Sequence, residues 1–320
     1  MQLLRDSRGG ERLSCVATIG NFDGVHLGHQ AVLRQVSQAA AARGLARVAV
    51  MFEPQPREVF RPGEEPRLTS LREKIERLRT QPLDRVLCLP FNARLAAMTA
   101  EAFVTQVLVA GSDVRHLVIG DDFRFGKGRR GDFALLTDLG ARSGFTVEAT
   151  ETLVLEGARV SSTRIRAALA RGDLAEAQAC LGRRYAISGR VVAGDRRGRT
   201  LGAPTANVAL GGRSLPVSGV FAVEVHGIGP GVHPGVANAG FRPTVDGRRP
   251  SLEVHLLRFE GDLYRRRITV EFLHRVRDER RFGSLDELKE QIGRDIEQAR
   301  QFFLQREDAS GSRHGERKRL

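Results

Sequence analysis

CVATIGNFDGVHLGHQ, residues 15–30, is the stretch that decides the fold of the first half of this 320-residue chain. It opens with an apolar run, residues 15–20, that reads as a buried strand. A glycine-containing polar loop follows over residues 21–29, and Val32, Leu33 and Val36 then recur at helical spacing. A strand that passes through such a loop into a helix predicts the first βα unit of an open α/β sheet.

The same alternation of short apolar runs and amphipathic segments continues to about Gly182, as expected of βα units on a parallel sheet. One amphipathic segment begins with a capping box, residues 70–73, followed by Ile75 and Leu78 at helical spacing. The predicted strands are residues 15–20, 46–52, 86–90, 116–120 and 145–149. We therefore predict a doubly wound α/β domain.

From Tyr185 the pattern changes to short alternating runs between turns rich in Gly and Pro, which is typical of a small antiparallel β-barrel. These runs cover residues 186–192, 220–226, 252–257 and 268–273. A C-terminal helix follows a second capping box, residues 284–287. Its apolar residues share one face and are Leu288, Ile292, Ile296, Ala299 and Phe303.

This change of periodicity predicts two domains, residues 1–182 and 183–305. The boundary is expected where Gly182 ends a short helix over residues 174–181. Residues 306–320 are polar and finish in a basic run, so we expect a disordered tail.

The composition, 41% hydrophobic and 28% charged, is that of a globular protein. No apolar stretch could span a membrane and the N-terminal residues lack a signal-peptide core, so a cytoplasmic location is expected. Cys15, Cys88 and Cys180 form no paired motif and are expected to be reduced and mostly buried. The formal net charge of +13 suggests nucleic-acid binding as an alternative, but the arginines are dispersed, and an enzyme of polyphosphate substrates would carry the same sign.

His26 and His29 stand at the start of the first predicted helix. In an open α/β sheet, ligands bind beyond the carboxyl ends of the strands, where a helix N-terminus offers N–H groups to an anion. The two histidines could face that position together, with Gly28 between them allowing close approach. The segment therefore predicts a phosphate-binding site, although a lone histidine is more often structural.

The segment GNFDGVHLGHQ, residues 20–30, resembles the HxGH nucleotidyltransferase superfamily, and in particular its FAD synthetase branch. The resemblance implies that His26 and His29 hold the β- and γ-phosphates of ATP while an acceptor phosphate attacks the α-phosphorus. It assigns Asn21, Asp23 and Gly28 to the same ATP site. Catalysis would then rest on alignment and on neutralising phosphate charge, normally with Mg²⁺.

A second signature, RVSSTRIR, residues 159–166, resembles the SSTxIR element with which that family grips the ATP phosphates. The resemblance assigns Arg159, Ser162, Thr163 and Arg166 to ATP binding. Hydroxyls and guanidinium groups at the start of a helix suit this task. A capped surface helix is the alternative, because Ser and Thr favour N-caps.

The run GDDFRFG, residues 120–126, resembles the family block on the adenine and flavin side of the cleft and implies flavin contacts by Asp122, Phe123 and Arg124. A GxGxxG string also occurs over residues 126–131, but residues 121–125 separate it from the preceding strand, so a dinucleotide fingerprint is not indicated. Where many members carry DPHP, this chain has EPQP, residues 53–56. We expect its prolines to shape the loop, with any role for Glu53 or Gln55 doubtful.

The string GDRRGRTLGAPTAN, residues 194–207, follows the first barrel run. Its glycines would let backbone N–H groups surround phosphates, and Thr205 and Asn207 offer two neutral oxygens to one Mg²⁺ ion. The string resembles the riboflavin kinase motif, in which PTAN supplies the metal ligands. The resemblance also assigns Gly194, Gly198 and Gly202 to ATP binding.

LEVHLL, residues 252–257, resembles the ExH strand of riboflavin kinases, whose glutamate is the general base for the riboflavin 5′-hydroxyl. This implies Glu253 as the catalytic base. In an alternating strand, His255 lies on the same face as Glu253, and Leu252, Val254 and Leu256 lie on the opposite face. The resemblance assigns His255 to flavin binding. Residues 277–282 match the family's RxExKF segment only loosely, which implies Arg277 and Glu279 as further flavin contacts.

The resemblance covers residues 13 to about 304, with the motifs in family order, and identifies the chain as a member of the bifunctional riboflavin kinase/FMN adenylyltransferase family. It implies two ATP-dependent transfers, with ATP, riboflavin and FMN as substrates, Mg²⁺ as cofactor, and neither nucleic acid nor membrane as partner. A single-activity enzyme with one decayed half and a non-enzymatic nucleic-acid-binding protein are the alternatives. The sequence does not give the oligomeric state.

Overall fold

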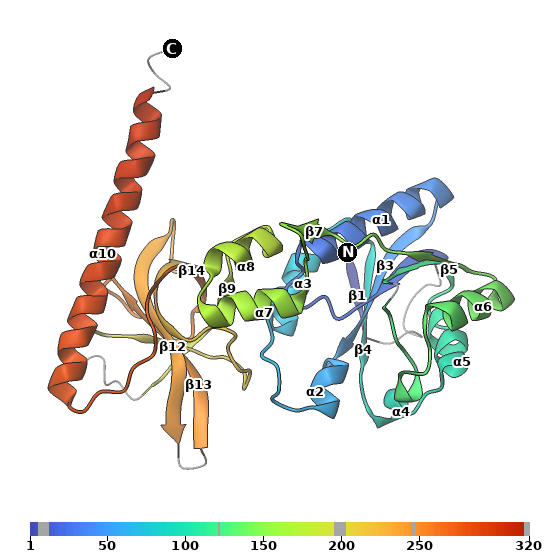
Figure 1. Cartoon of the computed structure of the whole chain (residues 1–320), viewed down its shortest axis with the longest axis horizontal. Coiled ribbons are helices and arrows are strands. Elements are labelled where there is room, and N and C mark those ends of the chain that lie inside the picture. Colours follow the sequence, from blue (N-terminus) through green and yellow to red (C-terminus); the bar gives the residue numbers. More distant parts are fainter. Residues whose placement is uncertain (6–12, 121, 195–202, 245–246, 317–320) are drawn as a thin grey trace. The chain divides into compact units, whose positions relative to one another are not determined.

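The structure is a computed structural model that describes residues 1–5, 13–120, 122–194, 203–244 and 247–316. The chain divides into two compact units between Arg164 and Ile165 (Figure 1). This division falls within helix α7, Ser162–Arg171, and assigns helix α8, Leu174–Leu181, to the second unit.

The first unit is built on a six-stranded sheet in the order β1-β4-β3-β2-β5-β6, with every neighbouring pair parallel. The strands are β1 Gln2–Leu4, β2 Cys15–Ile19, β3 Ala46–Glu53, β4 Arg85–Pro90, β5 Val114–Ile119 and β6 Thr146–Ala149. A separate two-stranded hairpin pairs β7, Val154–Leu155, with β8, Ala158–Arg159. The five predicted strands are confirmed to within about two residues, and β1 is an edge strand that the sequence did not predict.

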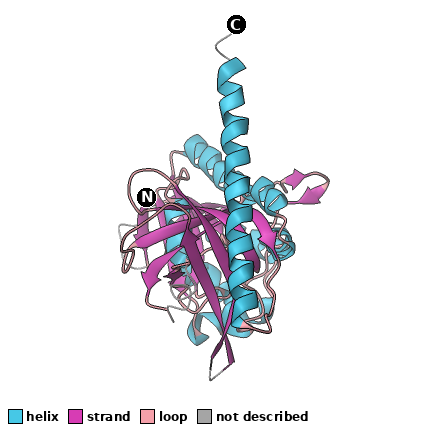
Figure 2. Ribbon diagram, turned by 90° about the vertical axis from the view of Figure 1, so that its left-hand side faces the viewer, coloured by secondary structure: helices cyan, strands magenta, loops and turns pink. Residues whose placement is uncertain are grey.

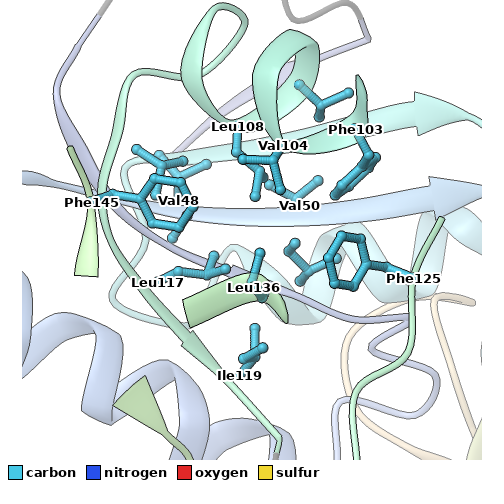
Figure 3. Close-up of a cluster of buried hydrophobic side chains, with 14 of the residues drawn as sticks. Val48, Val50, Phe103, Val104, Leu108, Leu117, Ile119, Phe125, Leu136 and Phe145 are labelled. Atoms are coloured by element: carbon cyan, nitrogen blue, oxygen red, sulfur yellow. The ribbon is translucent and has the colours of Figure 1, made fainter. Parts of the chain in front are cut away.

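Helices lie on both faces of this sheet because successive side chains of a strand point to opposite faces. On one face, Val48 and Val50 of β3 belong to the cluster in Figure 3, together with residues of α5, η1 and α6. On the other face, Ala49 of β3 packs with residues of α1 and α3. The predicted doubly wound α/β fold is therefore confirmed.

The helical segments of this unit differ in length and in how they begin. Ser70 caps α3 in the predicted capping box: its hydroxyl accepts from the Glu73 backbone N–H, and the Glu73 carboxylate accepts from the Ser70 N–H. The helices are α1 Leu27–Arg43, α2 Pro56–Phe60, α3 Leu71–Leu78, α4 Ala93–Ala96, α5 Ala100–Phe103 and α6 Phe133–Ser143, with a π-helical turn η1 Val104–Val109 and a 3₁₀ turn η2 Lys127–Arg129.

The second unit contains a closed antiparallel barrel in the order β10-β13-β12-β11-β14-β9. Closure leaves each strand paired on both sides, which removes the exposed edges of an open sheet. Gly182 ends α8 in the left-handed conformation, with φ of 70°, as predicted. The strands are β9 Ala186–Val192, β10 Ala206–Val208, β11 Gly219–His226, β12 His233–Thr244, β13 Gly247–Leu256 and β14 Arg267–Arg277.

The C-terminal helix α10, Leu285–Glu316, crosses the barrel and contacts β11, β12 and β14 (Figure 2). Ala299 is fully buried against the barrel residues Val220, Ala222 and Val236. The helix continues past residue 305, where we expected the folded part to end. Disorder of the tail stays a prediction.

A buried ion pair attaches α10 to the barrel. The Arg277 guanidinium donates to both carboxylate oxygens of Asp295, with Nε–Oδ1 and Nη2–Oδ2 distances of 2.8 Å. The Asp295 side chain is 5% exposed and that of Arg277 21%. Such a pair is expensive to break, because removing one partner leaves the other charge without compensation in a poorly solvated place.

The predicted state of the cysteines is confirmed, since Cys15, Cys88 and Cys180 are free and buried. Burial raises the pKa of the Cys15 thiol to about 12. Within the described ranges, no helix is both long enough and apolar enough to cross a membrane.

Asp295→Ala should destabilise the protein by about 3 kcal/mol, because it leaves the Arg277 guanidinium half-buried and unpaired. Chemical denaturation followed by circular dichroism measures the change. Glu290→Ala is the matched control on the same helix, since its partner Arg294 is exposed, and it should cost no more than about 1 kcal/mol. Equal losses for the two variants would show that the Arg277–Asp295 pair does not anchor the helix.

Candidate functional site

The loop after β2 lies at the point where the strand order of the sheet reverses. Chain order runs outward from β2 to β3 and β4 on one side, and to β5 and β6 on the other. Ligands of open α/β sheets bind at the carboxyl ends of the strands at this position. Residues 20–26 occupy it, and α1 begins at Leu27 with its N-terminal N–H groups beside the loop.

His26 and His29 are brought together as predicted. His26 is the N-cap of α1, and its Nδ1 accepts from the His29 backbone N–H at 3.2 Å. The two rings stack with centroids 3.6 Å apart. Because Nδ1 is an acceptor, the proton of a neutral His26 is on Nε2, where it can be donated to a phosphate oxygen.

His29 is held in its neutral form. Burial lowers its pKa well below the usual value, and the nearby charges of His26 and Lys74 lower it further. Its Nδ1 is buried and has no hydrogen-bond partner among the described residues. The neutral ring of His29 and the Nε2–H of His26 can therefore both donate hydrogen bonds at this position.

Asp23 fixes the loop in place. Its carboxylate accepts from the backbone N–H of Leu68, and from the N–H and hydroxyl of Thr69, each at 3.0 Å. Thr69 Oγ1 in turn accepts from the Gly24 N–H at 3.0 Å. All of these bonds are buried, so the loop is tied to the segment that precedes α3.

The loop also carries backbone strain. Phe22 and Val25 have φ of 48° and 41°, a region that a β-branched residue such as Val seldom adopts. Both side chains are buried. Strain that the surroundings hold in place is typical of functional sites. Asn21, at the start of the loop, is half-buried.

The second signature lies beside the first. Ser162, the first residue of α7, donates its hydroxyl to the Asp23 carbonyl at 3.0 Å. A Cβ at Gly28 would come within 3.1 Å of the Val160 carbonyl oxygen, so the two segments approach closely there. Thr163 follows on the first turn of α7, and Arg166 lies three residues further along that helix.

Arg159 and Asp122, assigned to ATP and flavin respectively, form an ion pair at 3.0 Å. Their side chains are 52% and 64% exposed, so the pair contributes little to stability and could open for a ligand. Phe123 stacks on Phe125, with centroids 5.6 Å apart. Arg124 is exposed.

Two residues of the EPQP loop, Glu53 and Gln55, have defined surroundings in the structure. Glu53, the last residue of β3, pairs through Oε1 with Arg67 at 2.8 Å. Gln55 is buried, and its Nε2 has no partner within the described part of the chain. Pro56 is the first residue of α2, which agrees with a role in shaping the loop.

A second cluster of predicted residues lies on the barrel. Asn207 of β10 is directly opposite Glu253 of β13, and the Thr205 hydroxyl donates to Glu253 Oε2 at 3.2 Å. A Cβ at Gly194 would clash with the Asn207 side chain, so only glycine fits there. Gly198 and Gly202 lie outside the described residues.

The predicted alternation of β13 is confirmed. Leu252, Val254 and Leu256 are buried, while Glu253 and His255 are half-buried on the other face. His255 Nδ1 donates to the Pro204 carbonyl at 3.0 Å. The hydroxyl of Thr205 and the amide oxygen of Asn207 are hard oxygen donors, and this donor set fits Mg²⁺.

Arg277 and Glu279 hold barrel segments together. Arg277 is engaged with Asp295, as described above. Glu279 accepts from the Ser218 hydroxyl and from the Phe241 N–H, both at 3.3 Å. Their assignment to flavin binding stays a prediction.

A third group of polar side chains lies elsewhere on the barrel. Glu224, His226 and Glu271 are close enough together to hold a metal ion. However, Arg184 pairs with both carboxylates, and Arg306 pairs with Glu224. The carboxylate charge is therefore balanced by guanidinium groups.

Two residues of the first site, Thr69 and Lys74, were not predicted from the sequence. Thr69 carried no signal beyond its place before a capping box. Lys74 carried one, because Leu71, Lys74, Ile75 and Leu78 fall on one helical face, where three apolar residues accompany a single charged one.

Two family models match the chain, FAD synthetase over residues 10–164 and riboflavin kinase over residues 181–303. The Escherichia coli (strain K12) protein named bifunctional riboflavin kinase/FMN adenylyltransferase is 52% identical, over 90% of this chain and 93% of its own. The protein of that name from Pseudomonas fluorescens is 50% identical, over 94% and 97%. That from Haemophilus influenzae is 45% identical, over 95% and 99%.

A crystal structure also resembles this chain. It is that of a Streptococcus pneumoniae protein named macrolide-efflux protein, with a TM-score of 0.78 and 30% identity over 93% of this chain and 98% of that one. Its name refers to efflux, whereas the names of the curated relatives refer to two enzyme activities. The likeness shows that the two chains share a fold.

Thr69→Val should destabilise the protein by about 1–3 kcal/mol, because it removes a buried hydroxyl that accepts from the Gly24 N–H and donates to the Asp23 carboxylate. Thr80→Val is the matched control: the Thr80 hydroxyl is exposed, donates to the Arg77 carbonyl and accepts from Gln81 Nε2, and water can replace both bonds, so the cost should stay below about 0.5 kcal/mol. Denaturation midpoints measure both. If Thr69→Val is as mild as the control, the Asp23–Thr69 bonds do not hold the loop.

Proposed function

The chain belongs to the bifunctional riboflavin kinase/FMN adenylyltransferase family, and on that premise we propose that it phosphorylates riboflavin to FMN and then adenylylates FMN to FAD, using ATP in both steps. The observation that carries the proposal is that each unit gathers one set of family motifs around one site. In the first unit, the Ser162 hydroxyl donates to the Asp23 carbonyl in the loop of residues 20–26, which we call the histidine loop. In the second unit, the Thr205 hydroxyl donates to the Glu253 carboxylate.

In adenylyl transfer, a phosphate oxygen of FMN attacks the α-phosphorus of ATP, and the bond to the β-phosphate oxygen breaks to release pyrophosphate. Negative charge moves onto the leaving pyrophosphate. The Nε2–H of His26, the neighbouring His29 and the N-terminal N–H groups of α1 are suited to stabilise it there. Ser162, Thr163, Arg159 and Arg166 would hold the other side of the polyphosphate.

In the kinase step, Glu253 accepts the proton of the riboflavin 5′-hydroxyl. The riboflavin 5′-oxygen attacks the γ-phosphorus of ATP, and ADP leaves. The hydrogen bond from Thr205 fixes the orientation of the Glu253 carboxylate. Thr205 and Asn207 would hold Mg²⁺, which when bound neutralises charge on the transferring phosphate. The absence of a Cβ at Gly194 leaves room for the Asn207 side chain.

The remaining assignments are made on the same basis. Asn21, Asp23 and Gly28 shape the ATP site of the first unit. Asp122, Phe123 and Arg124 contact the FMN flavin there, and His255, Arg277 and Glu279 the riboflavin of the second unit. We assign adenylyl transfer to residues 1–182 and the kinase to residues 183–305, and the family models over residues 10–164 and 181–303 support this order of the two activities. The cytoplasm, where ATP is abundant, is the proposed location.

His29→Ala should slow FAD formation from supplied FMN by about 10²–10³-fold, because one donor to the pyrophosphate is lost. FMN formation from riboflavin should stay at the parental rate. Chromatographic assay of both products, with thermal unfolding to verify the fold, provides the measurement. A folded variant with near-parental FAD synthesis would refute the assignment of His29.

Glu253→Gln should lower FMN formation by about 10²–10⁴-fold, because the amide cannot accept the hydroxyl proton. Adenylylation of supplied FMN should not change. Glu260→Gln, an exposed acid of the same unit, is the matched control and should leave both rates at the parental level. If Glu253→Gln behaves like this control, another group is the base.

A further inference from the structure

Lys74 is a charged side chain placed in the core of the first unit. Its solvent exposure is 0%, and its Nζ has no hydrogen-bond partner in the described part of the chain. No carboxylate oxygen described in the structure forms an ion pair with it. Burying an ammonium in this way costs several kcal/mol relative to an apolar side chain. The fold alone would be better served by Leu or Met at this position.

The position of Lys74 places it behind the histidine loop. Its helix α3 packs through Ile75 and Leu78 against β3 and β4, and against Phe22 and Val25 of the loop itself. The segment just before α3 is the one that Asp23 binds through Leu68 and Thr69. Lys74 is the fourth residue of α3 and therefore lies on the first turn after this segment.

The charges around Lys74 are mostly negative. Asp23 and Glu53 act on its ammonium from the loop and from the end of β3, and Arg67 acts from the segment before α3. Arg67 is itself shared between Glu53 and Glu58. Without Lys74, three carboxylates would face one guanidinium behind a site that has to receive a polyphosphate.

We propose that Lys74 is a positioning residue of the adenylyl-transfer site: its buried ammonium offsets the carboxylates of Asp23 and Glu53 and so keeps the position in front of His26 and His29 attractive to the polyphosphate of ATP. The inference rests on the proposed adenylyl transfer. Lys74 acts through the field in the site and through the loop, and it need not touch the substrate. Asp23 can then hold the loop without repelling the nucleotide.

The electrostatics of the neighbouring groups agree with this role. Burial lowers the pKa of Lys74, and Asp23 and Glu53 oppose that effect and favour the charged form. Lys74 is also one of the causes of the low pKa of His29, after burial and His26. The same ammonium therefore favours the neutral form of His29.

The decisive variant is Lys74→Met, which keeps the length and loses the charge. In an enzyme whose parental form makes FAD, we expect kcat/KM for ATP in adenylyl transfer to fall about tenfold or more, mainly through KM. Inhibition by pyrophosphate should weaken by a similar factor. Arg77→Met, which removes one exposed positive charge from the same helix, is the matched control and should leave both quantities unchanged.

Two further variants separate charge from packing. Lys74→Arg keeps a cation and should retain most of the ATP dependence. Combining Lys74→Met with Glu53→Gln restores the charge balance and should recover part of kcat/KM. Where Lys74→Met also lowers the unfolding midpoint, the double variant separates the two effects. If the double variant recovers both the unfolding midpoint and kcat/KM for ATP, the proposal is supported. If it recovers the unfolding midpoint but not kcat/KM, the proposal is overturned.

The proposal and the function on which it rests fail in different ways. A parental enzyme that forms no FAD from FMN and ATP contradicts the proposed function. A parental enzyme that forms FAD, with a folded Lys74→Met variant of equal kcat/KM and equal sensitivity to pyrophosphate, contradicts the role of Lys74 and leaves the function intact.

Discussion

The buried carboxylate of Asp23 is the interaction on which the first site depends. It accepts three hydrogen bonds of 3.0 Å from Leu68 and Thr69, and these bonds join the loop after β2 to the segment that leads into α3. The loop needs this support because Phe22 and Val25 are held at positive φ. With the loop fixed, His26 caps α1, and its ring tautomer follows from that cap. The loop proposed to bind the phosphates of ATP is thus itself held in place by a buried carboxylate.

The two units meet a common chemical demand, the binding of ATP phosphates, by different means. In the first, the polar groups stand at the end of a parallel sheet, where strand order reverses and a helix begins, so backbone N–H groups and imidazoles are the proposed donors. In the second, neighbouring antiparallel strands place Asn207 opposite Glu253, and side-chain oxygens stand in pairs along a strand face. Each solution follows from its fold, and neither requires a protein nucleophile.

The sequence predicted most of the architecture because periodicity reflects burial. The strand at residues 15–20, the box at Ser70 and the alternation around Glu253 are local patterns, and each is found in the structure. Strand β1 was missed because three residues at a sheet edge carry no periodic signal. The meeting of Ser162 with Asp23 depends on residues 139 positions apart, and family resemblance alone suggested it. Lys74 lies on the apolar face of its predicted helix, but a lysine there usually extends its ammonium to solvent, so its full burial could not be predicted from the sequence.

The dispersed arginines also acquire a physical explanation. Arg164 donates to the carbonyls of Leu155 and Ala158 and so closes the β7–β8 hairpin. Arg275 donates to the carbonyls of Arg171 and Ser218, and thereby ties the end of α7 to the barrel. Guanidinium groups suit such tasks because each presents several donors in a fixed plane and keeps its charge when partly buried. Many of the arginines therefore form hydrogen bonds or ion pairs with carbonyls and carboxylates within each unit. A high net charge distributed in this way reflects internal hydrogen bonding at least as much as attraction for an external polyanion, which is why charge alone was a weak guide to function.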